Sequence, residues 1–165
     1  MYVEISNRRS GKTTRLAQRI MDIITLNPHH TIYLHTISRR SYDNIINMLG
    51  VRYPHNNIVN ITYYGLVNGW SNGRMRRPNR NDNSWYFFDE FSYMSNYILK
   101  QYLLYSNICD KCYFSGTPHL GGGDSTLETM RLFCYRNGFT IENHGWGVED
   151  GYDMIKKTLR NHKFY

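Results

Sequence analysis

The stretch "ISNRRSGKTTRL", residues 5–16, contains the sequence GKTT at the point where a short strand pattern gives way to a helical one. Proteins bind a polyphosphate with backbone N–H groups, the positive end of a helix, a flexible cation and a hydroxyl group that ligates Mg²⁺. Gly11 allows close approach of the backbone, Lys12 can reach the β- and γ-phosphates, and Thr13 can bind Mg²⁺. The stretch therefore predicts a phosphate-binding loop.

The elements expected on either side of this loop support the same prediction. Residues 2–5, "YVEI", are predicted to form a strand, and a helix is predicted from Lys12 onward. The apolar face of that helix contains Leu16, Ile20, Ile23 and Ile24. Its N-terminus would then face the bound anion. The predicted nucleotide contacts are Ser6, Asn7, Arg8, Arg9, Ser10, Gly11, Lys12, Thr13 and Thr14.

A second candidate segment, "WYFFDE" at 85–90, ends an apolar strand pattern with two adjacent carboxylates. Asp89 is expected to hold Mg²⁺ through water, as a partner of Thr13. Glu90 is placed to orient or deprotonate the water that attacks a γ-phosphate. A solvated acid pair at a strand end is the alternative interpretation. The second acid favours hydrolysis over phosphate transfer to another substrate, because a kinase has no attacking water to activate.

A third segment, "SGTP" at 115–118, follows another apolar strand pattern. The carboxyl ends of parallel strands lie at one edge of a sheet, so this segment is expected beside the loop and the acids. Ser115 and Thr117 carry small hydroxyl groups that could sense a γ-phosphate and relay its loss. Taken alone, the segment would be an ordinary turn.

The order of the predicted elements indicates an α/β fold. Strands and helices alternate, which is typical of a mostly parallel central sheet with helices on both faces. Strands are predicted at 2–5, 31–36, 57–62, 85–91, 111–118 and 139–143. Helices are predicted from Lys12 to Pro28, at 38–50, 95–106 and 125–136, and around 148–159. Residues 1–165 are expected to form one domain, in which 119–165 add a helix, a strand and a helix to the sheet.

Composition narrows the class of protein. The 165 residues are 41% hydrophobic, and no apolar run approaches the roughly 20 residues of a membrane span. A formal charge of +7 would attract a polyanion such as nucleic acid, although solubility alone is the alternative explanation. The start of the chain lacks the pattern of a signal peptide. Three cysteines are too few for a disulfide framework, which favours a reducing cytoplasm. The pair Cys109 and Cys112 supplies two of the four ligands of a structural zinc, so zinc is not expected.

The three segments together resemble a known family. "SNRRSGKTT" at 6–14, "WYFFDE" at 85–90 and "FSGTP" at 114–118, in this order and spacing, resemble the ATPase core of the phage large terminases. These DNA-packaging motors belong to the helicase-like P-loop ATPases that have an added catalytic glutamate. The resemblance covers residues 1 to about 118, and 119–165 are compatible with it. It implies a RecA-like P-loop NTPase fold, ATP and Mg²⁺ as ligands, and a viral protein of the host cytoplasm.

The resemblance also implies roles for individual residues. In that family the loop tolerates loss of its first glycine, whose place Ser6 takes here, and it carries an arginine. Arg8 or Arg9 would contact the γ-phosphate as an internal arginine finger, and Glu90 would activate water. The residues that would couple hydrolysis to movement are Ser115, Gly116 and Thr117.

The implied partners are double-stranded DNA and either further copies of the chain in a ring or a viral protein such as a portal. Terminases also have an adenine-contacting segment before the loop and a nuclease domain after the ATPase. Here only Met1–Ile5 precede the loop, and no spare acidic cluster follows it. We therefore expect a terminase-like ATPase without a nuclease domain, with a fragment of such a protein, or a protein with another task built on the same ATPase core, as the alternatives.

Other basic and aromatic residues have two interpretations each. A predicted loop at 71–84 contains Arg74, Arg76, Arg77 and Arg80. These arginines could bind a nucleic-acid backbone or reach a neighbouring subunit's nucleotide, and a solvated loop is the alternative. Arg39 and Arg40 could contact nucleic acid or simply begin a helix. Stacking on bases is conceivable for Tyr63, Tyr64 and Trp70, although such aromatic residues more often belong to a core.

Two other functions remain open at this stage. A nucleoside kinase of the thymidine-kinase type has a similar loop, a "DE" strand and a CxxC sequence, but that family has two cysteine pairs. A DNA-binding accessory protein could hold a nucleotide as a structural element only.

Overall fold

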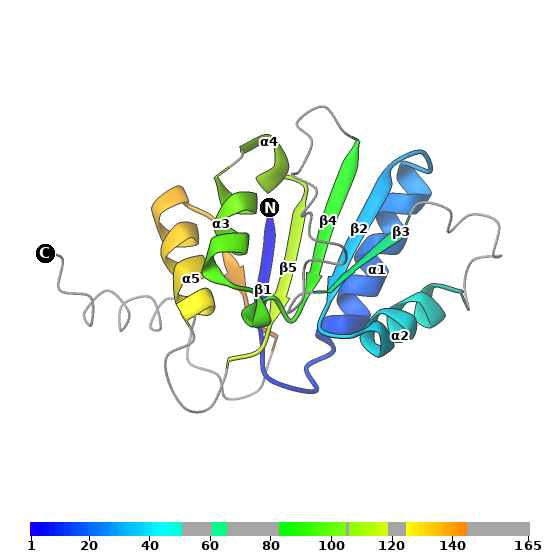
Figure 1. Ribbon diagram of the computed structural model, residues 1–165, viewed down its shortest axis with the longest axis horizontal. Coiled ribbons are helices and arrows are strands. Elements are labelled where there is room, and N and C mark those ends of the chain that lie inside the picture. The colour runs from blue at the N-terminus through cyan, green and yellow to red at the C-terminus, as the bar shows by residue number, and fades with distance from the viewer. Residues whose placement is uncertain (51–60, 66–82, 105, 119–124, 145–165) are drawn as a thin grey trace, which may run out of the picture.

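A computed structural model describes residues 1–50, 61–65, 83–104, 106–118 and 125–144 of the chain (Figure 1). The strands are β1 (Tyr2–Ile5), β2 (Thr31–Thr36), β3 (Ile61–Gly65), β4 (Ser84–Asp89), β5 (Cys112–Gly116) and β6 (Ile141–Glu142). The helices are α1 (Lys12–Leu26), α2 (Arg39–Gly50), the 3₁₀ helix η2 (Phe91–Tyr93), α3 (Asn96–Leu103), α4 (Ser106–Cys109) and α5 (Ser125–Asn137). This alternation confirms the predicted α/β fold.

The described strands form one sheet in the order β3-β2-β4-β5-β1-β6, and all of their pairings are parallel. β5 lies between β1, which precedes the phosphate loop, and β4, which ends in the acid pair. The register pairs Ile5 with Gly116 and Asp89 with Ser115. The ends of these three strands are therefore neighbours at one edge of the sheet.

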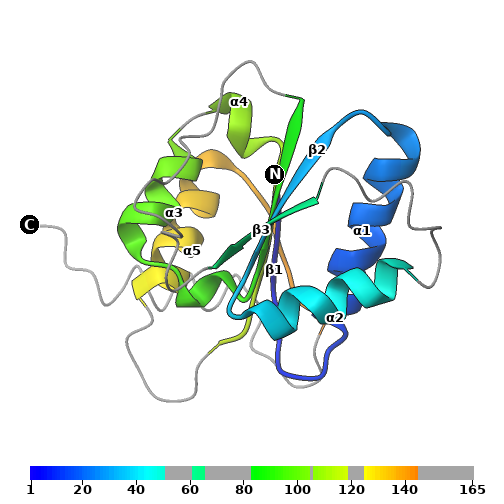
Figure 2. The same cartoon turned by 45° about the vertical axis from the view of Figure 1, so that its right-hand side comes forward.

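Helices cover both faces of the sheet, as Figure 2 shows with the strands seen nearly edge-on. On one face, α1 and α2 pack against the sheet through Leu16, Ile20, Ile45 and Leu49. On the other, α3, α4 and α5 pack through Leu99, Tyr102, Ile108, Leu127 and Met130. Neighbouring residues of β4 alternate between the two clusters: Phe88 belongs to the second and Phe87 to the first. Strands buried on both sides explain the nearly continuous apolar runs in the sequence.

Several predicted boundaries differ from the structure. The third strand was predicted at 57–62, whereas β3 spans Ile61–Gly65 and 57–60 lie outside the described residues. The helix predicted at 95–106 ends at Leu103, and a separate short helix α4 follows. The last strand is only two residues long. Helix propensity continues past Leu103, so local pattern alone does not mark this break.

Some predictions fall outside the described residues. The arginine loop with Arg74, Arg76, Arg77 and Arg80, and the C-terminal helix around 148–159, are not described. The prediction that 119–165 complete a single domain therefore remains a prediction. Among the helices that are described, none has the length and apolar character needed to span a membrane.

Candidate nucleotide-binding site

The phosphate loop turns through two residues with left-handed backbone conformations. Arg9 has φ of 62° and Gly11 has φ of 82°. Gly11 is the N-cap of α1 and makes no side-chain capping bond. The first N–H groups of α1 are therefore not capped by that residue, and such groups at a helix N-terminus can bind an anion. The helix begins at Lys12, as the sequence predicts.

A pocket of about 410 Å³ lies against this helix end. Its lining joins the loop to the ends of three strands: Arg8, Arg9, Ser10, Gly11, Lys12, Thr13, Thr14, Ile37, Glu90, Tyr93 and Thr117. The predicted loop, the predicted catalytic acid Glu90 and the predicted hydroxyl segment thus meet at one cavity. Ser10 Oγ is buried and makes no hydrogen bond within the described residues.

The Lys12 side chain is buried, with 5% of its surface exposed. Its Nζ donates to the Asn7 carbonyl over 3.1 Å and lies 3.6 Å from Glu90 Oε1. An ammonium group on a flexible stem can exchange such contacts for phosphate oxygens at little steric cost. Lys12 is therefore held between the loop and the acid, within reach of the pocket that it lines.

Asp89 is buried and faces two hydroxyl groups. Ser115 Oγ donates to Asp89 Oδ1 over 3.1 Å, and Thr13 Oγ1 lies 3.5 Å from the same oxygen. Burial, together with the nearby charge of Glu90, raises the pKa of Asp89 to about 6. The hydrogen bonds to this carboxylate offset the effect of burial only in part, so a nearby cation would stabilise its charged form. Thr13 and Asp89 supply oxygen ligands, which Mg²⁺ prefers, and so they fit a magnesium site.

Glu90 is the N-cap of η2 and has φ of 60°, a conformation that is uncommon outside glycine. Its Oε1 accepts a hydrogen bond from Thr117 Oγ1 over 2.7 Å and faces Lys12. Its Oε2 is buried and makes no hydrogen bond within the described residues. One carboxylate oxygen is thus held by Thr117 and Lys12, and the other is a buried acceptor without a partner among the described residues.

Ser6 explains why the first glycine of the loop can be absent. Its N–H donates to the Gly116 carbonyl over 3.1 Å, and its Oγ accepts a hydrogen bond from the His144 N–H over 2.9 Å. A glycine could not accept the second bond. The serine therefore ties the start of the loop to the end of β6, and Ser6 itself is fully buried.

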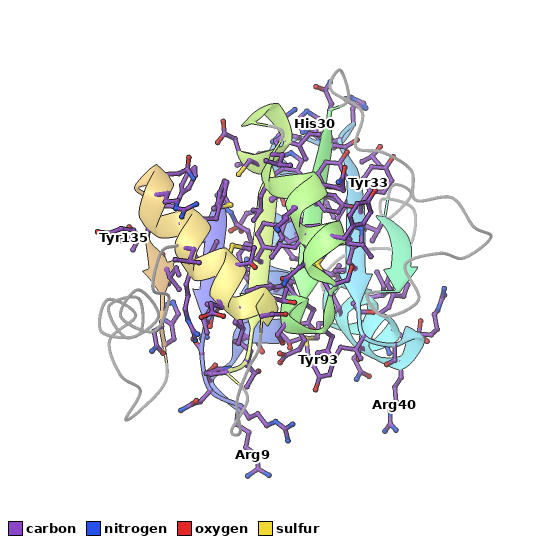
Figure 3. All side chains as sticks on the ribbon, turned by 60° about the vertical axis from the view of Figure 1, so that its left-hand side comes forward. Arg9, His30, Tyr33, Arg40, Tyr93 and Tyr135 are labelled. Carbon is purple, nitrogen blue, oxygen red and sulfur yellow. The ribbon has the colours of Figure 1, made fainter. Side chains whose placement is uncertain are left out.

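Arg8 and Arg9 are exposed at the pocket that they line. Figure 3 shows Arg9, Tyr93 and Arg40 at one end of the molecule, opposite His30. Arg39 forms an exposed ion pair with Asp43 and lies over the ring of Tyr42. The side chains of Tyr63 and Tyr64, and the whole of Trp70, lie outside the described residues, so their predicted roles are untested.

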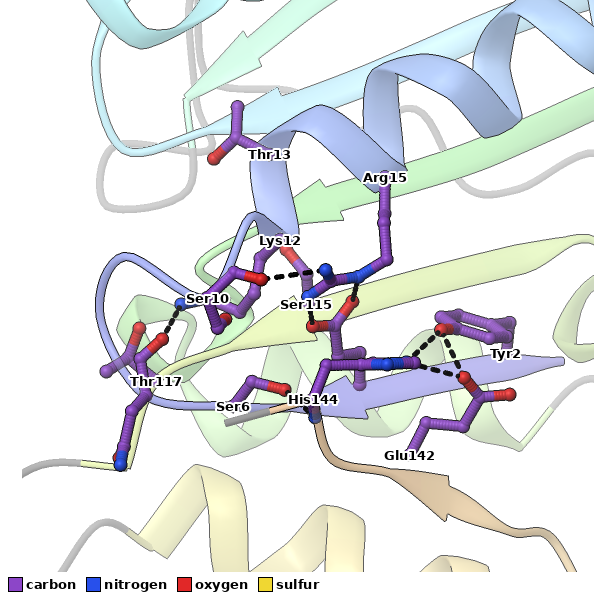
Figure 4. A network of polar contacts seen from close by, with 12 residues as sticks. Tyr2, Ser6, Ser10, Lys12, Thr13, Arg15, Ser115, Thr117, Glu142 and His144 are labelled. Atoms are coloured by element: carbon purple, nitrogen blue, oxygen red, sulfur yellow. Dashed lines mark hydrogen bonds and ion pairs between the residues drawn. The ribbon is translucent and has the colours of Figure 1, made fainter. Parts of the chain in front are cut away.

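Sequence reasoning missed a polar cluster behind the loop (Figure 4). Tyr2 donates to Glu142 over 2.7 Å, and the His144 ring lies 2.8 Å from the same carboxylate oxygen. Glu4, fully buried in β1, binds Arg15 of α1. An acid within the apolar strand "YVEI" is the one signal that could have indicated a buried partner.

The cysteine pair gives no sign of a metal centre. Cys109 and Cys112 are buried thiols, and Cys112 Sγ donates to the Ile108 carbonyl over 3.1 Å. Burial raises the pKa of both. Within the described part of the chain, no group of three or more His, Cys, Asp or Glu residues is arranged to hold a metal ion.

Comparison with known proteins gives no match: no family model, no curated protein and no solved structure matches the chain.

Proposed function

We propose that the protein is a Mg²⁺-dependent P-loop ATPase that acts as a motor on nucleic acid. One observation carries the proposal: Lys12, Glu90 and Thr117, from three separated segments, line a single pocket at the N-terminus of α1. Phosphate binding requires the loop and its lysine, and hydrolysis requires a group that activates water. The pocket contains both.

The residues have distinct parts in the proposed reaction. Lys12 and the N–H groups at the start of α1 bind the β- and γ-phosphates, and Thr13 with Asp89 holds Mg²⁺, which neutralises developing negative charge. Glu90 accepts a proton from the attacking water at the pocket that it lines. The γ-phosphate competes with Glu90 for Lys12, so that nucleotide binding weakens the contact that now holds the acid.

Two features favour a RecA-like assignment within this class. One strand, β5, separates the strand before the phosphate loop from the strand that ends in the acid pair. The hydroxyl group of Ser115, at the end of that strand, contacts Asp89, and Thr117 contacts Glu90. Ser115, Gly116 and Thr117 are thus in a position to transmit changes at the acids, which is the coupling role proposed for them.

The polymer substrate is proposed on the charge of +7 and on the resemblance to terminases. The proposed substrate is double-stranded DNA, moved during viral packaging or a related translocation in the host cytoplasm. A ring of identical subunits or a partner such as a portal completes the motor in this proposal. Arg8 or Arg9, which line the pocket, act as the arginine finger.

Glu90→Gln tests the proposal most directly. We expect ATP hydrolysis to fall by at least about 100-fold, because the amide cannot take the proton from water. Binding of a fluorescent nonhydrolysable ATP analogue is expected to persist, since the phosphate contacts remain. Phosphate release is measured with and without duplex and single-stranded DNA.

Asp22→Asn is the matched control. Asp22 lies on α1, and its contact with Gln18 at 3.0 Å can be kept by an asparagine oxygen. This variant should hydrolyse ATP like the unmodified protein. Equal hydrolysis by Glu90→Gln and the control would contradict the proposed role of the acid. Transfer of phosphate to thymidine in a parallel assay would instead indicate the kinase alternative, and binding without turnover would indicate the accessory protein.

A further inference from the structure

Arg15 connects three parts of the site from behind the loop. Its guanidinium group binds both carboxylate oxygens of Glu4, with the Nε contact at 3.2 Å. Its remaining nitrogen, Nη1, donates to the carbonyl of Ser10 over 2.7 Å. Figure 4 shows Arg15 reaching back from α1 toward Ser10. β1, α1 and the phosphate loop are therefore joined through one side chain.

The surroundings of Arg15 are built around this arrangement. Glu4 has no exposed surface, and its hydrogen bond raises the pKa of Arg15. A β-carbon on Gly11 would lie 3.1 Å from Arg15 Nη1. Gly11 thus has two reasons to be glycine: its left-handed backbone and the closeness of the guanidinium group. Only the forked geometry of arginine can bind a carboxylate with two nitrogens and a carbonyl with a third.

A second contact also holds the loop, but nucleotide binding would break that contact under the proposed function. Lys12 Nζ holds the Asn7 carbonyl, but the same ammonium group is the one expected to turn toward phosphate. Arg15 has no such conflict, because it holds the main-chain carbonyl of Ser10, its other partner Glu4 is fully buried in β1, and Arg15 is not among the residues that line the pocket.

We propose that Arg15 is a positioning residue that holds the phosphate loop in its binding conformation before nucleotide arrives. The inference rests on the proposed function, and it assigns Arg15 no contact with substrate. If the pair is broken, the loop samples other conformations, and the apparent affinity for nucleotide falls by the fraction of molecules that remain competent. Saturating nucleotide restores the loop, so the turnover rate is preserved.

Arg15→Gln and Arg15→Lys test the inference, with Arg19→Gln as the matched control. Arg19 lies on the same helix and is exposed. Two measurements are made: hydrogen exchange of the amides at 7–11 in the nucleotide-free protein, and the KM and kcat of Mg-ATP hydrolysis. Arg15→Lys keeps a charge beside Glu4 and serves if the glutamine variant does not fold.

For the Arg15 variants we expect loop exchange to be about tenfold faster and KM about tenfold higher, with kcat changed less than about twofold. The control should match the unmodified protein in all three quantities. Unchanged loop exchange, or a fall in kcat at constant KM, would overturn the inference. Absence of ATP turnover and of nucleotide binding in the unmodified protein would instead remove the proposed function, while hydrogen exchange would still decide whether Arg15 holds the loop.

Discussion

Adjacent carboxylates have different environments in this site. Asp89 is almost completely buried and accepts from Ser115, whereas Glu90 lies at the pocket with one oxygen held by Thr117. Burial penalises the charged form of Asp89, so its proton is bound more tightly in the folded protein than in the unfolded chain. These environments suit the separate tasks proposed for the two acids: Asp89 as a cation ligand, and Glu90 as a base.

The raised pKa of Asp89 predicts a pH-dependent cost in the metal-free protein. Because the folded pKa is about 6 and the ordinary value is 3.8, the folded state binds more protons between these values. Stability therefore falls as pH rises through this window and levels off above it. Asp89→Asn removes this cost. The free energy of unfolding of the variant, minus that of the unmodified protein, should therefore grow by roughly 3 kcal/mol from about pH 4 to about pH 7.

Urea unfolding in EDTA at several pH values checks this difference. The comparison between the two proteins is needed because buried His35 has the opposite slope: burial lowers its pKa from 6.5 to about 4, so its contribution rises with pH. A difference between the variant and the unmodified protein that stays constant with pH would show that Asp89 is not shifted.

At the level of elements, β5 packs closely against η2 beside Glu90, the proposed catalytic acid. A β-carbon on Gly116 would lie 2.7 Å from Phe91 Cε1 and 3.0 Å from Phe91 Cδ1. Phe91 is fully buried and immediately follows Glu90. The strand approaches the aromatic ring so closely that a side chain at position 116 would clash with it, which requires glycine at this position of the proposed coupling segment.

Gly116→Ala is expected to lower the free energy of unfolding by about 1–3 kcal/mol, since the ring must shift within a packed core. The ATP turnover rate should fall as well, because displacement of Phe91 moves the adjacent Glu90. Urea unfolding and phosphate release at a temperature well below the unfolding midpoint check both effects. Gly50→Ala in α2 is the control: among the described residues, no atom beyond the backbone of its own helix lies within 4 Å of its β-carbon. Its stability should be unchanged or higher by up to about 1 kcal/mol. Equal stability of the two variants would contradict the packing argument.

At the level of the whole molecule, the sheet gathers the loop, the acids and the hydroxyl segment at one edge while its two faces are closed by helices. Arg8 and Arg9 line the same pocket as Lys12 of their own chain. This geometry favours an arginine finger that acts within the subunit, even if the working motor is a ring.

Mixing subunits distinguishes the two origins of the finger. One variant is Lys12→Ala, and the other carries Arg8→Ala and Arg9→Ala together. If the arginines act within their own subunit, mixing the two inactive proteins should give no more ATP hydrolysis than the average of each alone. Recovery of activity in the mixture, with native mass measured on the same samples, would show that the arginines serve a neighbouring subunit.

Local patterns in the sequence were enough to predict the alternation of elements, the start of α1 at Lys12 and the three segments that line the pocket. Periodicity and turn residues are properties of short stretches, and parallel strands bring their carboxyl ends to one edge. The end of α3 at Leu103 was predicted wrongly, because helix propensity continues past it, and the third strand was predicted to end at Thr62 whereas β3 continues to Gly65.

Only the tertiary structure decided how these segments are held. Glu4 and Arg15 are 11 residues apart, Glu90 and Thr117 are 27 apart, and Ser6 and His144 are 138 apart. Which donor meets which acceptor across such separations depends on strand order and register, and a residue type alone does not encode it. The sequence by itself therefore predicted which segments line the pocket, whereas the packing of β1, α1 and β6 determined the contacts that hold the loop.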